Sequence, residues 1–293
     1  MVQDRAFLVL GATGRTGSRV VARLRQRGEK VRARARSTSP GFDWHDEATW
    51  KPALEGVTSA YVVAAQTTAV RVDEPDRKVG FAAEQVARFC RLASRSGVRH
   101  IVLLSGRTGL SGSPYITALE RAVTDSGADW TILRPGSFAQ NFVTEPARSS
   151  IAAGSYQAFD IGGQAQDFID VDDIAAVAVE ALTAPGHDGK VYELSGPEAL
   201  TGEEAAGIIA RTLGRPVTYS EIPPDGWARQ ARAQGLTEES IDWVLTAVTS
   251  MRDGYFRPHD GVQRVLGRLP RPFGEFVAQA AAAGAWGPVH PGE

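Results

Sequence analysis

The segment 6–17 reads AFLVLGATGRTG, and it decides the fold of the chain. Its first five residues, 6–10, are apolar and predict a buried strand, and the glycines that follow at once predict a tight turn. The residues at about 16–27 have the apolar spacing of a helix, and 31–36 predicts a second strand. A glycine turn between a strand and a helix is the context in which such a turn binds a dinucleotide.

The three glycines of this turn have different tasks. Gly11 permits the tight turn, Gly14 lets the backbone approach a pyrophosphate, and Gly17 lets the helix pack closely on the sheet. The amides at the start of the helix then bind the diphosphate. We therefore expect a dinucleotide here, and a glycine-rich turn without a ligand is the alternative. The expected contacts come from Gly11, Thr13, Gly14, Arg15, Thr16 and Gly17.

The end of the second strand indicates which dinucleotide binds. An NAD site normally has Asp or Glu there, about 20 residues beyond the turn, to bind the ribose 2′-hydroxyl. This chain has Arg32, Arg34 and Arg36 instead, followed by Ser37. Arginine suits a 2′-phosphate, with Arg15 of the glycine turn close by, so the sequence predicts NADP(H) as the cofactor. A solvated basic edge is the alternative interpretation.

Strand-like and helical patterns alternate through the first half of the chain. Apolar runs recur at 60–64, 100–105 and 130–133, and helical patterns lie between them, around 77–96 and at about 114–126. This order predicts a parallel sheet covered by helices on both faces. The expected fold class is α/β, a Rossmann-type doubly wound parallel sheet with a smaller α+β carboxy-terminal substrate region.

The pattern becomes irregular in the second half, which is richer in Gly, Pro and Ser. We expect an NADP(H)-binding Rossmann domain at 1–137 and a mainly substrate-binding region at 138–293. Some segments of the latter, such as 166–195, are expected to return to the Rossmann sheet. A helix is predicted at 174–182, and the acids at 170–173 are expected to cap its first turn rather than to take part in catalysis.

The composition of the chain argues against several classes of partner. Its 293 residues are 43% hydrophobic, enough for a substantial core, and the formal net charge is only −2. A balance so close to neutral favours neither nucleic acid nor an anionic membrane as a partner. No signal peptide is apparent, and no run approaches the roughly 20 apolar residues that cross a bilayer. We expect a cytoplasmic protein, monomer or homodimer, that acts on a small molecule.

Metal and thiol chemistry have little support in the sequence. The single cysteine, Cys90, lies among apolar residues at helical spacing and is expected to be buried. The histidines are scattered, with no pair at metal-ligand spacing. We therefore expect no metal site.

Further motifs extend over nearly the whole chain. They read VLLS at 102–105, DWTILRPGSF at 129–138, NF at 141–142, FIDVDDIA at 168–175 and YELSGP at 192–197. Together with the glycine turn, these motifs resemble the NmrA-like family of atypical short-chain dehydrogenases/reductases. FDW at 42–44 with ATW at 48–50 is similar to a branch that includes the ergot-alkaloid iminium reductases and bacterial relatives.

The resemblance implies a Rossmann domain that carries NADP(H) along the strand ends, with a substrate pocket under the carboxy-terminal region. By the matching positions, Arg36 would bind the 2′-phosphate, and Asp43 and Trp44 the adenine. Family members include reductases of quinones, iminium ions and other activated acceptors, and also inactive nucleotide sensors. The ribose would lie against Ala64, Ala65 and Gln66, and the nicotinamide beside Ser105, Pro135, Gly136 and Phe138.

One feature of ordinary short-chain dehydrogenases is absent from this sequence. In those enzymes a lysine four residues after a tyrosine lowers the tyrosine pKa and makes it a workable proton donor. No tyrosine here has such a lysine, and no lysine occurs between Lys78 and Lys190. A positioned acid is worth about 10² to 10⁴ in rate, so an ordinary ketone would be a poor substrate. An iminium ion, a quinone or a conjugated enone can accept hydride with little proton donation.

Candidate residues for catalysis and for the substrate pocket follow from these positions. Tyr115, Ser105, Gln66 or a water molecule could still polarise an acceptor. Tyr115 ranks first because it opens a helix, although a tyrosine there is as compatible with simple packing. Aromatic side chains of the carboxy-terminal region, among them Trp227, Trp243, Tyr255 and Phe256, could line a pocket for a planar substrate, and core packing is the alternative for each of them. The expected pocket residues are Tyr115, Phe138, Asn141, Phe142 and Trp227.

Taken together, these patterns predict an NADPH-dependent reductase that transfers hydride to a small activated acceptor without a tyrosine-lysine pair. The alternative is a non-catalytic NADP(H) sensor that regulates another protein, because the missing lysine is equally compatible with that role. Turnover would distinguish the two. An epimerase of the extended dehydrogenase type is a third possibility, and the absent tyrosine-lysine pair counts strongly against it.

Overall fold

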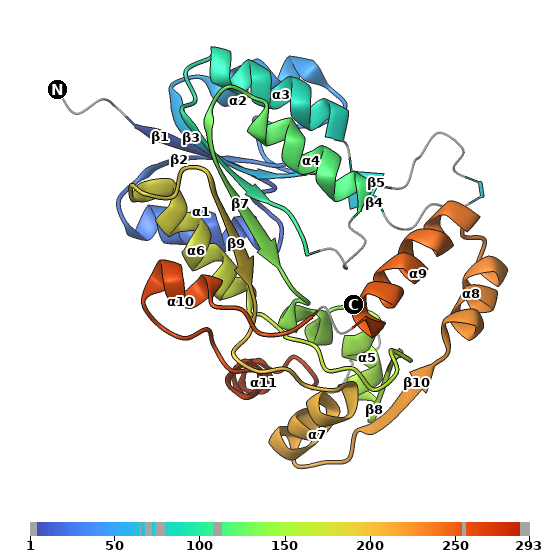
Figure 1. The fold of residues 1–293 in the computed structure, drawn as a ribbon. Helices are drawn as coiled ribbons and strands as arrows, with labels where there is room; N and C mark the ends of the chain where they lie inside the picture. Colours follow the sequence, from blue (N-terminus) through green and yellow to red (C-terminus); the bar gives the residue numbers. More distant parts are fainter. Residues whose placement is uncertain are drawn as a thin grey trace.

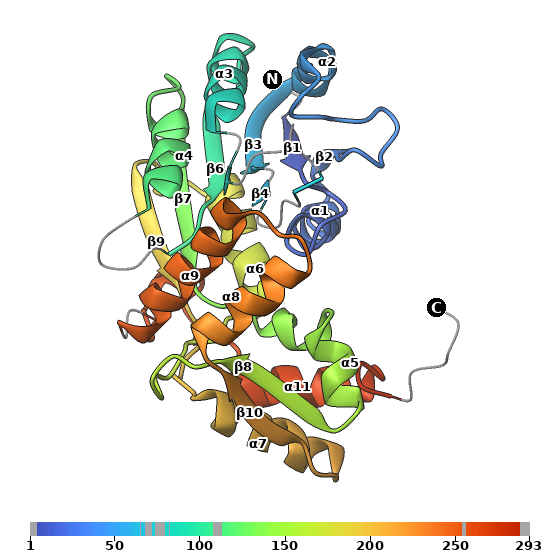
Figure 2. The same ribbon diagram turned by 90° about the vertical axis from the view of Figure 1, so that its right-hand side faces the viewer.

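The chain forms two parts that lie one above the other in Figure 1, a sheet with its helices and a smaller part beneath it. A second view shows α8 and α9 beneath the lower edge of the sheet and above β8 and β10 (Figure 2). No helix of the residues described is both long and apolar enough to cross a bilayer. The computed structural model describes residues 5–64, 66–67, 72–73, 80–81, 83–107, 113–253 and 256–287.

The larger part is built on a six-stranded parallel sheet with the order β2-β1-β3-β6-β7-β9. The strand order reverses between β1 and β3, and doubly wound sheets bind ligands at the carboxyl ends of their strands at such a switch point. The predicted Rossmann-type fold class is therefore confirmed. The strands are β1 (Ala6–Leu10), β2 (Lys30–Arg34), β3 (Val57–Val63), β6 (His100–Leu104), β7 (Asp129–Pro135) and β9 (Lys190–Leu194).

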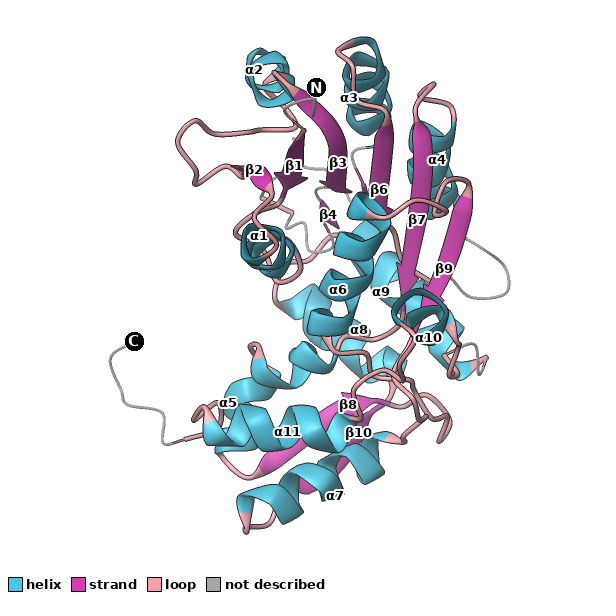
Figure 3. Cartoon of the chain, turned by 90° about the vertical axis from the view of Figure 1, so that its left-hand side faces the viewer, coloured by secondary structure: helices cyan, strands magenta, loops and turns pink. Residues whose placement is uncertain are grey.

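Helices cover both faces of this sheet (Figure 3). Ile101 and Leu103 of β6 point into one core and Val102 into the other, which is why the strand is apolar at every position. One face carries α1 (Gly17–Gln26), α6 (Val171–Thr183) and α10 (Gly261–Leu266). The other carries α2 (Trp50–Leu54), which follows the short helix η1 (Glu47–Thr49), together with α3 (Ala83–Arg95) and α4 (Pro114–Thr124).

The smaller part has a core of its own. Phe142, Phe168 and Phe273 pack at ring-centroid distances of 5.0 to 5.3 Å. A parallel pair of strands, β8 (Ser155–Phe159) and β10 (Thr218–Ile222), lies beside this core. The helices are η2 (Ala139–Val143), α5 (Ala147–Ala152), α7 (Gly202–Leu213), α8 (Pro224–Ala233), α9 (Glu238–Arg252) and α11 (Phe273–Ala282). Near the switch point, β4 (Gln66–Thr67) pairs antiparallel with β5 (Gly80–Phe81).

The chain passes between the two parts several times. After β7 it forms η2, α5 and β8 in the smaller part, and it returns to the sheet with α6 and β9. The segment 166–195 thus contributes a helix and a strand to the larger part. A further crossing places α10 against α6 and α11 against α7. Several segments of the chain consequently connect the two parts. These connections hold the two parts in a defined position relative to each other.

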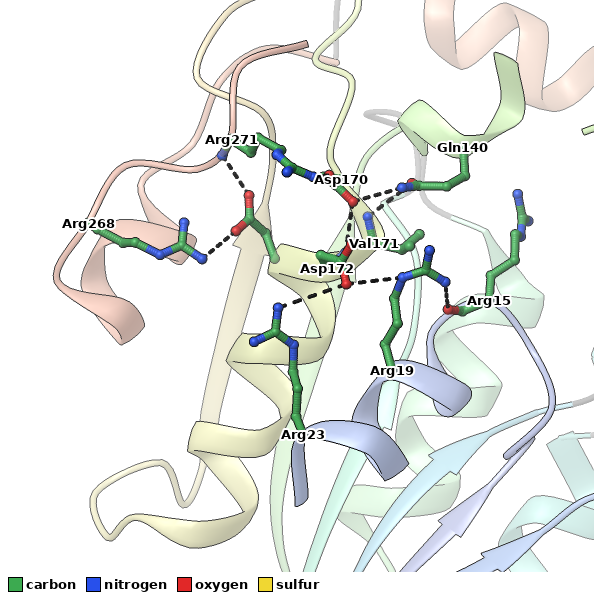
Figure 4. A network of polar contacts seen from close by, with 10 residues as sticks. Arg15, Arg19, Arg23, Gln140, Asp170, Val171, Asp172, Arg268 and Arg271 are labelled. Atoms are coloured by element: carbon green, nitrogen blue, oxygen red, sulfur yellow. Dashed lines mark hydrogen bonds and ion pairs between the residues drawn. The ribbon is translucent and has the colours of Figure 1, made fainter. Parts of the chain in front are cut away.

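The amino end of α6 joins three of these segments (Figure 4). The Asp170 carboxylate accepts a hydrogen bond from the amide of Asp172 at 2.9 Å, so it caps the helix as predicted. It also accepts from Gln140 Nε2 of η2 and from Arg271 Nη1 in the segment before α11, both at 2.7 Å. The side chain of Asp170 is only 1% exposed. This one carboxylate therefore holds three segments of the chain together.

The two acids that follow extend the same network. Asp173 Oδ1 accepts from Arg268 Nη2 at 2.6 Å, again in the segment before α11. Asp172 Oδ1 accepts from Arg19 Nε of α1 at 3.1 Å, and Arg19 Nη1 donates to the carbonyl oxygen of Arg15 at 2.8 Å. The end of the glycine turn is thus connected to α6 through a single arginine (Figure 4).

Candidate active site

A cavity of about 970 Å³ opens at the carboxyl ends of the central strands. One side is formed by the glycine turn after β1, the end of β3, and the loops after β6 and β7. The opposite side is formed by α9, which crosses below the sheet (Figure 2), together with Phe256. Ligand sites of small molecules and cofactors typically have about 300 to 1,000 Å³ of volume. The cavity therefore lies at the switch point of the sheet and is large enough for a ligand.

The glycine turn has the geometry that a diphosphate site requires. Gly11 has a φ of +64°, and its carbonyl oxygen accepts from the amide of Gly14 at 2.9 Å. A Cβ at Gly17 would collide with that same carbonyl oxygen, so only glycine lets α1 start so close to the turn. No carbonyl of the described residues accepts from the amides of Thr13, Arg15 and Thr16. These amides fit an anionic group at the helix start.

The second strand ends two residues earlier than predicted, and Arg36 lies in the turn that follows. The amide of Ala35 donates to Thr38 Oγ1 at 3.0 Å, and the amide of Thr38 donates to the carbonyl oxygen of Ala35 at 3.2 Å. This turn leaves Arg36 and Ser37 exposed. Ser37 Oγ donates to Thr13 Oγ1 at 3.4 Å, so the end of β2 meets the glycine turn.

Three arginines follow one another along this edge. Within the part of the chain described, no carboxylate forms an ion pair with Arg32, Arg34 or Arg36. Burial, and then the charge of Arg32, lower the pKa of Arg34. Like charges gathered without a counter-ion favour the binding of an anion. The arrangement fits a phosphate on the ribose of a dinucleotide.

The two residues expected near the adenine have different surroundings. Asp43 is half-buried, and its Oδ1 accepts from the amide of His45 at 2.9 Å. Trp44 is only 8% exposed, and its ring packs edge-on against Phe42 and Phe89 at 5.0 and 5.4 Å. Most of the Trp44 ring is therefore used in the core on one face of the sheet, and Asp43 is the more accessible of the two.

The expected ribose contacts lie at the end of β3. Ala64 directly follows that strand and is buried. The backbone of Gln66 pairs with Phe81 in the β4–β5 pair. Ala65 lies outside the residues described, as does the side chain of Gln66. The neighbouring Val63 lines the cavity.

The loops after β6 and β7 bring the expected nicotinamide contacts into the cavity. Ser105, Pro135, Gly136 and Phe138 all line it. The amide of Ser105 donates to the carbonyl oxygen of Leu133 at 2.9 Å, which holds the two loops side by side. A Cβ at position 136 would collide with buried charged groups behind the loop, so Gly136 is required by packing.

Those charged groups form an ion pair, and its arginine, Arg107, is among the residues that line the cavity. Arg107 Nη2 and Asp167 Oδ2 lie 2.5 Å apart, and both side chains are fully buried. Burial raises the pKa of Asp167 to about 7, and the Arg107 guanidinium opposes that rise. Arg107 also donates to the carbonyl oxygens of Leu194 and Arg257, each at 3.1 Å. The pair thus fixes the loop after β6 to β9 and to the segment that follows α9.

A second group of charges lies behind Ser105. Ser105 Oγ donates to Glu120 Oε1 of α4 at 2.7 Å, and Arg134 of β7 donates to both oxygens of that carboxylate at 2.6 and 2.8 Å. Neither Glu120 nor Arg134 was predicted as a residue of the site. A signal was present, because Glu120 lies three residues before the buried Val123, on the same face of the helix, and a charge on such a face needs a partner.

The aromatic residues that line the cavity come from α4, from α9 and from the segments that follow β7 and α9. Tyr115 is 38% exposed and packs edge-on against Trp243 at a centroid distance of 4.8 Å. Phe138 and Asn141 line the cavity as well, and Arg15 connects them. Its guanidinium lies 4.9 Å above the Phe138 ring, and its Nη1 donates to Asn141 Oδ1 at 2.7 Å. The cavity thus has an aromatic wall close to the glycine turn.

Two residues expected in the pocket do not line this cavity. Phe142 is 2% exposed and belongs to the aromatic core of the smaller part. Trp227 packs against Phe159 of β8 at 5.4 Å. Both were chosen because they are aromatic and close in sequence to cavity residues or to α9, which does not specify the direction of a side chain. Trp243 and Met251 of α9 line the cavity instead.

A doubly wound sheet with a glycine turn and a cavity at its switch point defines a dinucleotide-binding protein of the Rossmann class. A family model described as NAD(P)H-binding matches residues 11–185. The chain therefore belongs to this NAD(P)H-binding family.

Similar proteins cover almost the whole chain. The uncharacterized oxidoreductase YesF of Bacillus subtilis is 33% identical, over 96% of this chain and 97% of its own. Agroclavine dehydrogenase of Claviceps fusiformis is 30% identical, over 93% of this chain and 96% of its own. The structure of an Escherichia coli NADPH-dependent quinone oxidoreductase complexed with NADPH has a TM-score of 0.77, with 22% identity over 94% and 99% of the two chains. The protein is accordingly an NAD(P)H-dependent oxidoreductase.

Proposed function

We propose that this protein is an NADPH-dependent reductase that transfers hydride to a small activated acceptor, such as an iminium ion, a quinone or a conjugated enone. The observation that carries the proposal is the cavity at the switch point, which joins the glycine turn to an aromatic wall. Tyr115 and Trp243 form that wall, and Phe138, which lies against Arg15 of the turn, lines the same cavity. A planar acceptor could lie against these rings, beside the nicotinamide.

Different residues around the cavity would bind different parts of the cofactor. The amides of the glycine turn would hold the diphosphate, and Arg36 and Ser37 with Thr13 would hold the 2′-phosphate. Asp43 would meet the adenine. NADPH supplies a hydride when it is bound, and the protein would place Pro135–Phe138 beside the nicotinamide and α9 over the acceptor. The substrate region would thus come from the second half of the chain, 138–293.

The proposed reaction needs no dedicated proton donor. The residue four positions after Tyr115 is Leu119, which is fully buried and cannot lower the pKa of a tyrosine. An acceptor that is already electron-poor needs little proton donation in the rate-limiting step. Agroclavine dehydrogenase and the quinone oxidoreductase, to which this chain is similar, have names that are compatible with such acceptors.

The proposal is tested by mixing the protein and NADPH with a panel of cyclic iminium salts, quinones and enones while the absorbance of NADPH is recorded. We expect oxidation that depends on the acceptor, with simple ketones at least about 10²-fold slower. Tyr115→Phe should retain most of the rate, because the acceptor needs no acid. Tight NADPH binding without oxidation across the panel would contradict the reductase and support the sensor.

Arg36 is expected to select NADPH over NADH. Arg36→Ala should weaken NADPH binding by about 10- to 100-fold, since a charge-assisted hydrogen bond contributes roughly 1.5 to 3 kcal/mol. NADH binding should change little, and fluorescence titration with both dinucleotides measures the two constants. Arg25→Ala removes an equally exposed arginine from α1 and serves as the control. An equal loss for NADPH and NADH would show that Arg36 does not contact the 2′-phosphate.

A further inference from the structure

The hydroxyl of Ser105 has its hydrogen directed away from the cavity. Ser105 lines the cavity, and its Oγ donates to Glu120 Oε1 at 2.7 Å. A serine has only one hydroxyl hydrogen, while its oxygen has two lone pairs. Because the hydroxyl hydrogen is bonded to Glu120, only the lone pairs of the Ser105 oxygen can interact with a ligand in the cavity.

Arg134 ensures that Glu120 remains the acceptor in this bond. Its Nε donates to Oε1 at 2.8 Å and its Nη2 to Oε2 at 2.6 Å, so the guanidinium grips both oxygens. The hydrogen bond and charge of Glu120, with a further contribution from Glu193, raise the pKa of Arg134. The side chain of Glu120 is only 11% exposed. An ionised carboxylate accepts hydrogen bonds and cannot donate one.

This polarity has a consequence for the reaction. If Ser105 gave its proton to an acceptor, an alkoxide would remain beside the Glu120 carboxylate in a largely buried place. Two negative charges in contact disfavour that state strongly. A ligand N–H or O–H, in contrast, can donate a favourable hydrogen bond to Ser105 Oγ, because the bond to Glu120 already polarises this oxygen.

We propose that Glu120, held by Arg134, is a positioning residue that makes Ser105 a hydrogen-bond acceptor towards the cavity. Ser105 then receives an N–H of the bound ligand and does not protonate it. The inference rests on the proposed function, because it assumes that a nicotinamide and an acceptor occupy the cavity. Two groups could supply the N–H, namely the carboxamide of the cofactor or a protonated cyclic imine bound as acceptor.

The first arm of the test measures binding of the cofactor alone. The probes are NADP+ and its 3-acetylpyridine analogue, in which a methyl ketone replaces the carboxamide and removes the N–H. If Ser105 accepts from the carboxamide, the wild type should bind NADP+ about three- to tenfold more tightly than the analogue, as expected for one hydrogen bond. Ser105→Ala should bind both with nearly equal affinity.

The second arm measures binding of an acceptor to the protein saturated with NADP+. The probes are 3,4-dihydroisoquinolinium, which has an N–H, and its N-methyl derivative, which has none. If the N–H comes from the acceptor, Ser105→Ala should remove a preference for the first probe and leave the cofactor ratio of the first arm unchanged. A preference that depends on Ser105 in either arm supports the proposal and identifies the source of the N–H.

The role of Glu120 is tested by a double-mutant cycle on the same binding ratios. Glu120→Gln should reduce the preference in wild type and have no further effect on it in Ser105→Ala, because it acts through that hydroxyl. Glu193→Gln is the matched control, since Glu193 Oε1 also pairs with Arg134, at 3.2 Å, and is not bonded to Ser105. It should leave the ratio unchanged. Thermal unfolding of each variant shows separately whether the fold is retained.

Three results would overturn the proposal while leaving the proposed function in place. Ratios that do not respond to Ser105→Ala in either arm would show that Ser105 accepts nothing from the ligand. Additive effects of Ser105→Ala and Glu120→Gln would show that Glu120 acts independently of Ser105. A loss of rate in Ser105→Ala with unchanged binding and a lost solvent isotope effect would make Ser105 the proton donor. Failure of the wild type to bind NADP+ would overturn the proposed function as well, and it is seen before any variant is made.

Discussion

Gly17→Ala is expected to weaken NADPH binding by at least about 100-fold, or roughly 2.7 kcal/mol. The added Cβ would collide with the carbonyl oxygen of Gly11, and the carbonyl carbon of Gly11 and the Cα of Ala12 lie only 2.8 and 3.2 Å from it. All three are backbone atoms, so no side-chain rotation can relieve the contact. The start of α1 must therefore move away from the turn, and the amides that would hold the diphosphate move with it. Titration with NADPH, followed by fluorescence, measures the change.

The control is another glycine in the first turn of a helix, at a position where an added Cβ has more space. Gly274 is the second residue of α11, and a Cβ there would meet only a methyl group of Ile208, at 4.0 Å. Gly274→Ala should retain NADPH binding and gain a little stability, since alanine favours a helix by up to about 1 kcal/mol over glycine. Normal NADPH binding by Gly17→Ala would mean that the diphosphate is not held at this turn.

The sequence was sufficient to predict the sheet because its strands are buried on both faces. Runs such as those of β1 and β6 are apolar throughout, and only a parallel sheet between two layers of helices explains such runs next to amphipathic helices. The parallel pair of β8 and β10 was harder to predict. Tyr156 and Ala158 of β8 alternate with polar residues on an outer sheet, and the partner strand lies some 60 residues further along the chain.

The part of the candidate site that follows from the order of the strands was the most predictable. The glycine turn and the ends of β6 and β7 line the cavity as predicted from their order in the sheet, because strand ends must meet at one edge. The wall formed by α9 was not predictable, since nothing in its sequence specifies how the smaller part rests against the sheet. For the same reason the sequence did not specify that Phe142 and Trp227 lie outside the cavity while Trp243 lines it.

Asp170→Ala is expected to reduce the free energy of unfolding by about 3 to 5 kcal/mol, the usual effect of removing one partner from a buried ion pair. The carboxylate is 1% exposed and accepts from Arg271, from Gln140 and from the helix amide of Asp172. Its loss leaves a guanidinium and an amide without their acceptor and removes the helix cap. For a chain of this size the melting temperature should fall by about 10 °C, which scanning calorimetry would measure.

Asp172→Ala is the control that tests whether the burial of the Asp170 carboxylate causes that loss of stability. Asp172 also pairs with an arginine, Arg19 at 3.1 Å, but its side chain is 37% exposed. An ion pair so accessible to water contributes at most about 1 kcal/mol, so Asp172→Ala should lower the melting temperature by only a few degrees. The two variants remove the same chemical group from the same turn of α6. Equal losses of stability would show that the negative charge at the start of α6, rather than the buried contacts of Asp170 to η2 and to the segment before α11, accounts for the effect.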